Sequence, residues 1–218
     1  MGCELSIQIM LFLQAFVPLI MGFNFSGTLN VFRLIANPSL CLPHHTVSTF
    51  NELPIPLSRA FAASSNTEKV DIRAVVLDKD NCFAIKDTNN IFPAYEKRFA
   101  ELKDAYPGAR LLIVSNSAGT LSHPTGQDAE TLERVTGVPV LRHNVKKPGC
   151  GLQVMDYFRS KPETEVTSPS QVAVVGDRLF TDIMLANMMG SYGFWIKDGV
   201  QEDRGLVRCR GFCHVRDC

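Results

Sequence analysis

The pattern of apolar positions changes at Val70. Beyond this residue, short apolar runs rich in β-branched side chains alternate with longer stretches that are apolar on one helical face. The runs predict strands, and they lie at 72–77, 111–115, 138–141, 172–176 and 192–196. The stretches between them predict helices at 95–106, 128–136, 149–158 and 181–189. Strands that alternate with helices in this way are typical of a parallel sheet with helices on its faces.

The helical stretches have defined inner faces and ends. In the first of them, Phe99, Leu102 and Tyr106 share a face, which we expect to pack inward. The last is followed by Gly190, a residue type that often ends helices because it adopts left-handed backbone angles without strain. Residues 70–200 therefore predict one α/β domain, a Rossmann-like parallel sheet of about five strands flanked by helices.

The segment from 24 to 69 has a different pattern. Leu29, Phe32 and Ile35 share one face of a predicted helix, which Pro38 ends. This face fits two interpretations: a helix packed on the domain, and an amphipathic helix that associates with a membrane interface. Residues 38–67 are rich in Pro, Ser and Asn and indicate a linker or an arm draped over the domain.

Two terminal segments fall outside this organisation. Residues 1–23 form an apolar N-terminal extension of doubtful origin, slightly short for a membrane span and without the basic residues of a targeting signal. A superfluous upstream extension, a membrane-associated segment and a signal remain alternatives for it. Residues 201–218 form a divergent tail, in which the cysteines and histidine of "CRGFCHVRDC" match no zinc-site spacing.

Charge and cysteine content narrow the class of protein. The chain has 22 Lys and Arg residues against 22 Asp and Glu residues, so its overall charge gives no reason to expect a nucleic acid partner. Seven scattered cysteines, an odd number, favour a reducing compartment over a disulfide framework. We interpret one of them, Cys82, as a small buried filler. The sequence carries no indication of the oligomeric state.

Polar residues follow four of the predicted strands. Ligands of parallel sheets bind beyond the carboxyl ends of the strands, so these residues are the candidates for a functional site. They are Asp78 and Asp80 after the first strand, Ser115 and Asn116 after the second, Lys147 after the third, and Asp177 and Asp182 after the fourth.

The residue types at these positions suit phosphoryl transfer. A carboxylate such as Asp78 can attack phosphorus and become an aspartyl-phosphate, while Asp80 moves protons at the leaving group and at water. The Ser115 hydroxyl and the Lys147 ammonium can hold phosphoryl oxygens. Asn116 is either a turn former or a further contact to the substrate.

The closely spaced carboxylates also predict a cation. Asp78 and Asp80 would repel each other unless a positive charge lay between them. Asp177 completes a set of oxygen ligands of the kind that Mg²⁺ prefers, and no histidine or thiolate is positioned for zinc. Asp182 either joins the metal ligands or orients Lys147.

Four short stretches resemble the motifs of the haloacid dehalogenase superfamily, in the order that this superfamily uses. They are "DKDNC", "IVSNS", "KKPG" and "VVGDRLFTD". The resemblance implies that Asp78 is the nucleophile, Asp80 the acid and base, Ser115 the phosphate-binding hydroxyl, Lys147 the lysine that precedes proline, and Asp177 a metal ligand.

Longer stretches closely resemble the fungal mitochondrial phosphatidylglycerophosphatases over residues 24–200, among them "LLIVSNSAGT" and "VAVVGDRLFTDIMLANMMGSYGFWIKDGV". This resemblance implies a Mg²⁺-dependent enzyme that converts phosphatidylglycerophosphate to phosphatidylglycerol, a step towards cardiolipin. It also implies peripheral association with the mitochondrial inner membrane, on the matrix side.

Other classes of protein share parts of this pattern. A receiver domain carries its acceptor aspartate after the third strand, where this chain has "RHNVKKPG" and no acid. An inactive membrane-binding module is disfavoured because every motif residue is present. A phosphatase for a soluble phosphomonoester or a phosphoprotein remains open, because the short intervals between motifs leave little or no room for a cap domain. Arg142 and His143 are either surface residues or contacts to a second phosphate.

Overall fold

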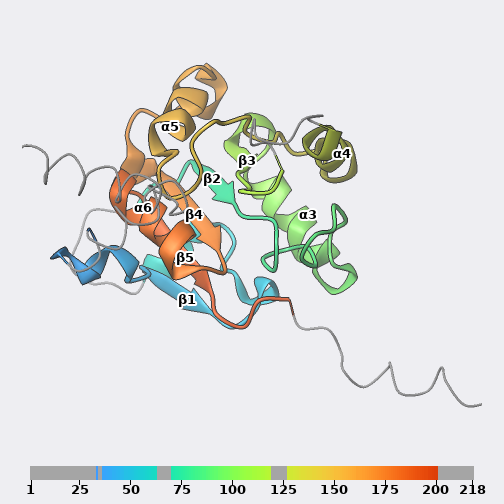
Figure 1. Cartoon of the computed structure of the whole chain (residues 1–218), viewed down its shortest axis with the longest axis horizontal. Coiled ribbons are helices and arrows are strands. Elements are labelled where there is room, and N and C mark those ends of the chain that lie inside the picture. Colours follow the sequence, from blue (N-terminus) through green and yellow to red (C-terminus); the bar gives the residue numbers. More distant parts are fainter. Residues whose placement is uncertain (1–32, 34–35, 63–69, 119–126, 201–218) are drawn as a thin grey trace, which may run out of the picture.

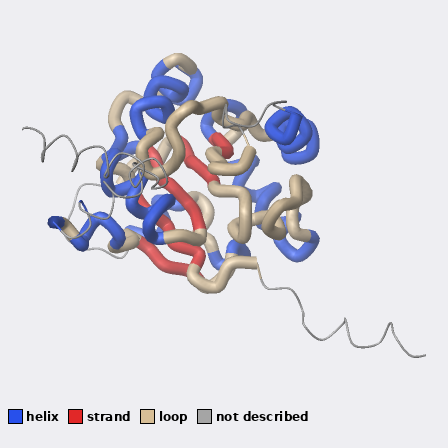
Figure 2. The backbone as a smooth tube through the Cα atoms, in the orientation of Figure 1, coloured by secondary structure: helices blue, strands red, loops and turns tan. Residues whose placement is uncertain are grey.

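The computed structural model describes residues 33, 36–62, 70–118 and 127–200. In these ranges five strands form one sheet in the order β1-β5-β4-β2-β3, and every neighbouring pair is parallel (Figure 1 and Figure 2). The prediction of a parallel α/β sheet of about five strands is confirmed. The strands are β1 His45–Val47, β2 Ala74–Leu77, β3 Leu111–Ile113, β4 Val172–Gly176 and β5 Tyr192–Ile196.

Helices cover both faces of this sheet. One face carries Val75 and Leu77 of β2 and packs against α3 and α4, whereas Ala74 and Val76 face α5 and α6. The division follows from the strict alternation of side chains along a strand. The helices are α3 Glu96–Ala105, α4 Gln127–Thr136, α5 Gly151–Arg159 and α6 Met184–Met189.

The predicted helix features are present. Phe99, Leu102 and Tyr106 are all buried, so the inner face of the first helix is as expected. Gly190 ends α6 with φ 79°, the left-handed conformation for which glycine is favoured. The last helix is shorter than predicted, because Leu179–Ile183 form a π-helical turn and α6 begins only at Met184.

One predicted strand is wrong. Residues 138–141 make a single bridge between Val140 and Ile113 and no continuous strand. Pro139 lies in the middle of this run and has no N–H to donate, although its carbonyl still accepts a hydrogen bond from Ile113 N at 2.9 Å. A short apolar run that contains proline therefore stays at the margin of the sheet.

The fifth strand comes instead from the proline-rich arm. β1 pairs with β5 at the far edge of the sheet, although the two strands lie far apart in the sequence (Figure 1). The 3₁₀ turns that follow it bury Phe50, Leu53 and Leu57 completely. The Leu57 backbone N–H also donates to the hydroxyl of Tyr106 at 2.9 Å. Residues 45–61 are therefore part of the domain and not a linker to it.

Several predicted segments lie outside the described residues. These are the helix face of Leu29, Phe32 and Ile35, the extension 1–23 and the tail 201–218. Among the helices that the structure describes, none has both the length and the apolar character required to cross a bilayer. The described connections between strands hold 3₁₀ and π-helical turns and at most two α-helices, α4 and α5 between β3 and β4, in agreement with the prediction of little or no cap domain.

The aromatic cluster around Phe50 provides a test of the arm's role. The Phe50 ring packs against Phe83, Tyr95 and Phe99, with centroid distances of 6.5, 5.6 and 6.3 Å. We expect Phe50→Ala to lower the free energy of unfolding by about 3–5 kcal/mol, measured by denaturant titration. Phe180→Ala is the matched control, since that ring is 63% exposed and its loss should change stability little. Equal effects of the two substitutions would contradict the placement of the arm in the core.

Candidate active site

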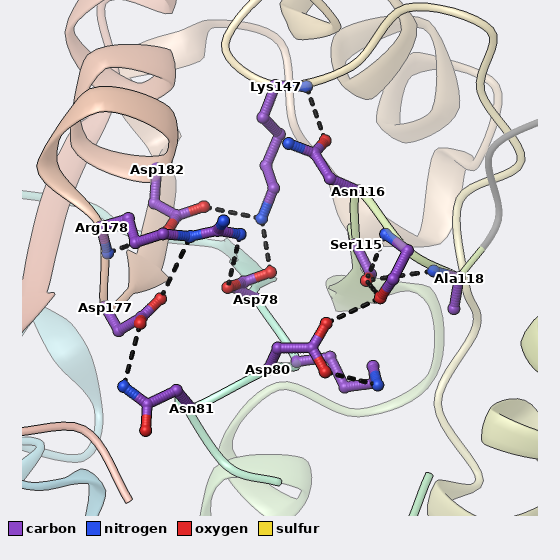
Figure 3. A network of polar contacts seen from close by, with 12 residues as sticks. Asp78, Asp80, Asn81, Ser115, Asn116, Ala118, Lys147, Asp177, Arg178 and Asp182 are labelled. Carbon is purple, nitrogen blue, oxygen red and sulfur yellow. Dashed lines mark hydrogen bonds and ion pairs between the residues drawn. The ribbon is translucent and has the colours of Figure 1, made fainter. Parts of the chain in front are cut away.

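The predicted site residues meet at the carboxyl edge of the sheet (Figure 3). Asp78 follows β2 directly, Ser115 comes two residues after β3, and Asp177 follows β4. Lys147 enters from the loop before α5, and Asp182 from the π-helical turn before α6. Such π-helical turns are rare and are frequently found at functional sites.

A buried lysine joins two of the acids. Lys147 Nζ donates to Asp78 Oδ1 at 2.5 Å and to Asp182 Oδ1 at 2.6 Å, and all three side chains are at most 1% exposed. The backbone N–H of Lys147 donates to Asn116 Oδ1 at 2.8 Å, which ties the lysine loop to the end of β3. The position of Lys147 is therefore fixed from three strands of the sheet.

The charges of this group do not balance. The pKa of Asp78 is raised to about 6: burial is the largest cause, the charge of Asp182 acts in the same direction, and Lys147 opposes both effects. Burial alone would lower the pKa of Lys147, but the two carboxylates outweigh it and raise that pKa above its ordinary value. One ammonium faces two buried carboxylates, so this group of three side chains carries a net negative charge.

A third carboxylate adds to this excess. Asp78, Asp177 and Asp182 each place a carboxylate oxygen within 4.8 Å of the others. Two buried atoms of this group, Asp78 Oδ2 and Asp177 Oδ1, have no hydrogen-bond partner. Burial raises the pKa of Asp177, although a hydrogen bond from Asn81 opposes the shift. Unpaired carboxylate oxygens without nitrogen or sulfur donors fit a hard divalent cation.

Asn81 orients Asp177, a role that the sequence interpretation missed. Its side-chain amide donates to Asp177 Oδ2 at 3.1 Å, and its carbonyl Oδ1 accepts from Val200 N at 3.2 Å. Trp195 Nε1 holds the Asp177 carbonyl oxygen at 2.9 Å. These contacts leave Asp177 Oδ1 facing the other acids (Figure 3). The sequence signal that could have indicated this role is the Asn directly after the second acid of "DKDN". Asn tolerates left-handed backbone angles better than most residues, and Asn81 adopts them here with φ 58°.

Asp80 lies with Ser117 and Lys79, and its carboxylate is not in the group of three acids. Oδ1 accepts from Lys79 Nζ at 2.7 Å and from Asp87 N at 3.0 Å, while Oδ2 accepts from Ser117 Oγ at 2.7 Å. Burial favours a higher pKa, but the hydrogen bonds from Lys79 and Ser117 outweigh it and lower the pKa of Asp80. Asp80 is therefore ionised at neutral pH in this arrangement.

Ser115 is buried and is held by its own turn. Its Oγ accepts from the backbone N–H groups of Ser117 and Ala118, both at 3.2 Å, and lies 2.9 Å from Ser117 Oγ. Ser117, which the sequence interpretation did not single out, thus connects Ser115 to Asp80. Asn116, between Ser115 and Ser117, lies in the same turn and accepts the hydrogen bond from Lys147 N, and it is partly exposed.

The two residues considered for a second phosphate are engaged elsewhere. Arg142 Nη2 lies 3.0 Å from Glu133 Oε2, and its Nη1 donates to the Val140 carbonyl at 2.8 Å. His143 is 1% exposed, with Nδ1 2.7 Å from the Val145 carbonyl oxygen and Nε2 3.0 Å from that of Ser115. Neither side chain is placed to meet a ligand at the mouth of the site.

Cys82 is fully buried, as its interpretation as a filler requires. Burial raises the pKa of its thiol well above the ordinary value, and the nearby acids, Asp78 first among them, act in the same direction. A neutral thiol is a poor ligand for a hard cation, so Cys82 does not alter the chemistry of the acidic group.

A parallel sheet whose carboxyl edge gathers an aspartate pair, a serine, a lysine and further acids in this chain order defines a phosphatase of the haloacid dehalogenase superfamily. The family model of the mitochondrial PGP phosphatases matches residues 25–201, and the chain belongs to this family. The predicted resemblance over residues 24–200 is thereby confirmed.

The match to two curated relatives covers most of the length of each relative. The chain is 52% identical over 179 residues to phosphatidylglycerophosphatase GEP4 of Saccharomyces cerevisiae, a mitochondrial protein, covering 82% of this chain and 89% of the relative. It is 38% identical over 185 residues to the probable mitochondrial phosphatidylglycerophosphatase of Schizosaccharomyces pombe, covering 84% of this chain and 87% of that protein.

Gly176 permits the close approach of Asp182. A Cβ built at position 176 would overlap the Asp182 carboxylate, which Lys147 holds in place. We expect Gly176→Ala to lower the free energy of unfolding by about 1–3 kcal/mol and to weaken divalent-cation binding, measured by calorimetry. Gly151→Ala is the matched control: its Cβ would lie 2.6 Å from Met189 Cγ, the middle of a flexible side chain that can move. An equal loss of stability and of cation binding in both variants would contradict this assignment.

Proposed function

We propose that the protein hydrolyses phosphatidylglycerophosphate to phosphatidylglycerol, on the path to cardiolipin. The observation that carries the proposal is the 52% identity to a phosphatidylglycerophosphatase over 89% of that relative's length. The carboxyl edge of the sheet supports it, because every residue that the reaction requires is present there. We further propose a mitochondrial location, at the matrix side of the inner membrane, since two relatives are named as mitochondrial.

The first chemical step transfers the phosphoryl group to Asp78. A carboxylate oxygen of Asp78 attacks phosphorus, and the bond between phosphorus and the glycerol oxygen breaks. Lys147, already hydrogen-bonded to Asp78, neutralises charge on the phosphoryl oxygens as the pentacoordinate state forms. The leaving oxygen takes a proton from Asp80, and phosphatidylglycerol departs.

The second step restores Asp78. Asp80, now a carboxylate, removes a proton from water, and the water oxygen attacks the phosphorus of the aspartyl-phosphate. The bond from phosphorus to Asp78 breaks, which releases inorganic phosphate. The lowered pKa of Asp80 keeps its carboxylate ionised, which is the form that can accept a proton. For its role as an acid, the negative charge of the bound substrate must first raise that pKa.

Mg²⁺ is the cation that we propose for the acidic group, where it would neutralise phosphoryl charge and offset the repulsion among the carboxylates. Asp78 and Asp177 offer unpaired oxygens, Oδ2 and Oδ1 respectively. Both oxygens of Asp182 already accept hydrogen bonds, one from Lys147 Nζ and one from Arg178 N at 3.2 Å. We therefore assign Asp182 chiefly to the orientation of Lys147, and Asp78 and Asp177 to the metal.

Peripheral contact with a membrane is part of the same proposal. Large apolar side chains are exposed at Leu42, Leu152 and Phe180, at 64%, 79% and 63%. Phe180 lies in the turn between Asp177 and Asp182, so an apolar side chain emerges beside the site. The exposed Phe180 beside the site supports the presentation of a headgroup from a lipid surface.

The substrate class is tested by direct comparison. The purified full chain is assayed against phosphatidylglycerophosphate in mixed micelles and against soluble phosphomonoesters, with kcat/KM measured for each. A preference for the lipid supports the proposal. A preference for the soluble esters would exclude the lipid assignment and leave the alternative, a phosphatase for a soluble phosphomonoester or a phosphoprotein.

Substitution of the two motif aspartates tests the covalent mechanism. We expect Asp78→Asn to abolish turnover because an amide is a poor nucleophile, and Asp80→Asn to reduce kcat by about 10²–10⁴-fold through the loss of proton transfer. Asp87→Asn is the control. The residue is exposed, and it contacts Asp80 through its backbone N–H, which the substitution leaves in place. Near-normal turnover by Asp78→Asn would contradict the aspartyl-phosphate.

Metal binding is expected to depend on pH through Asp78. A cation that binds the native protein raises its melting temperature, and the binding requires the ionised carboxylate. Because burial raises the pKa of Asp78 to about 6, protons compete with Mg²⁺ below this pH and not at pH 7.5. We expect the increase in melting temperature with Mg²⁺ to be full at pH 7.5 and to shrink progressively from pH 6 to pH 5. A shift that is independent of pH over this range, or that survives Asp177→Ala unchanged, would rule out this pair of ligands.

A further inference from the structure

Two buried lysines at the carboxyl edge, Lys147 and Lys79, are fully engaged with protein groups. Lys147 lies between Asp78 and Asp182 and is 1% exposed. Lys79 is 3% exposed, and its Nζ lies 2.7 Å from Asp80 Oδ1 and donates to the Thr88 carbonyl at 2.7 Å. Neither of these two ammonium groups reaches solvent, so neither is available to an anionic group of a ligand outside the reaction centre.

Arg178 is a half-exposed cation beside Asp78 and Asp177 (Figure 3). Its side chain is 49% exposed, with Nη2 3.9 Å from Asp78 Oδ2 and Nε 3.6 Å from Asp177 Oδ1. These distances are those of ion pairs and are too long for hydrogen bonds. In the described part of the chain the guanidinium donates no hydrogen bond, although it carries five N–H donors.

The base of this side chain is fixed while its tip is not. The Arg178 backbone N–H donates to Asp182 Oδ2 at 3.2 Å, and the residue directly follows Asp177. The guanidinium points towards the two carboxylate oxygens that have no hydrogen-bond partner. These are the atoms assigned above to the metal, and a divalent cation there would repel a guanidinium only a few ångströms away. With the cation in place, the favoured partner of Arg178 is therefore an anion on the open side of the site.

The substrate class supplies such an anion. Phosphatidylglycerophosphate carries a phosphodiester one glycerol unit away from the phosphomonoester that reacts. The fork of a guanidinium matches two phosphate oxygens, and charge-assisted pairs of this type are strong and specific. Resting on the proposed function, we propose that Arg178 binds the phosphodiester of the substrate and thereby selects headgroups with two phosphates over simple phosphomonoesters.

The transferred phosphoryl group is the other candidate partner of Arg178. Lys147 already contacts the attacking carboxylate from inside the protein, whereas Arg178 approaches from the solvent side. The two cations thus lie at different depths, in keeping with one reacting phosphate inside and one linked phosphate at the mouth.

The test compares two water-soluble substrates that differ in the second phosphate: the deacylated headgroup glycerophosphoglycerophosphate and glycerol 3-phosphate. The measured quantity is the ratio of their kcat/KM values in the full-length chain with Mg²⁺. We expect Arg178→Gln to lower this ratio by about tenfold or more, and Arg178→Lys to restore part of it. Arg142→Gln, the same substitution of an arginine that is paired with Glu133, should leave the ratio unchanged.

Binding without turnover gives a second readout. In the Asp78→Asn background, calorimetry with Mg²⁺ measures the affinity for each compound directly. We expect Arg178→Gln to weaken binding of the headgroup by about tenfold and to change binding of glycerol 3-phosphate far less. The half-exposed side chain makes no hydrogen bond in the described structure, so melting curves should show that the variant is folded.

The outcomes separate the two proposals. An unchanged ratio in Arg178→Gln would overturn the inference. If this unchanged ratio came with equal losses of kcat/KM on both compounds, Arg178 would act on the transferred phosphoryl group instead. If the unsubstituted protein hydrolyses the lipid but Arg178→Gln keeps its preference, only the inference fails. If the unsubstituted protein shows no preference for the lipid or its headgroup, the proposed function fails and the inference with it.

Discussion

The buried contact of Lys147 with Asp78 and Asp182 is the interaction on which the rest of the site depends. Each partner comes from a different part of the sheet edge, so the contact forms only when the loop before α5 and the turn before α6 are both in place. Breaking a buried ion pair by removing one partner leaves an uncompensated charge. The same contact therefore constrains the local fold and the reactivity of Asp78.

The carboxylates at this site outnumber the cationic side chains beside them. Three carboxylates meet near one buried ammonium and the half-exposed guanidinium of Arg178, and two of their oxygens have no hydrogen-bond partner. In isolation such a group would take up protons and lose its nucleophile. The three carboxylates can all stay ionised only when an added cation offsets their repulsion. The proposed divalent cation would also neutralise the charge of an anionic substrate, which links the electrostatics of the fold to the chemistry that we propose.

Much of this could be predicted because the determining signals are local in sequence. Apolar runs rich in β-branched or aromatic side chains marked β2, β4 and β5, and the residues that follow parallel strands necessarily share an edge. What depends on tertiary packing was missed. β1 has three residues, too few for an alternation pattern, and Pro139 was outweighed by its apolar neighbours. The contacts of Asp80 with Ser117 and of Asn81 with Asp177 depend on side-chain directions that spacing does not reveal. The exposure of Arg178 likewise follows from the turn and not from residue type.

The pairing of β1 with β5 has a consequence for the order in which the chain folds. His45 lies opposite Phe194 and Val47 opposite Ile196, so within the described residues the first strand pairs with the last. During synthesis, or during passage through a narrow channel from the N-terminal end, β1 and the apolar turns after it emerge well before that partner. Contacts of such long sequence separation form slowly, and the segment remains without its sheet until the final strand arrives. The edge of the sheet formed by β1 can therefore be completed only late, once β5 is available.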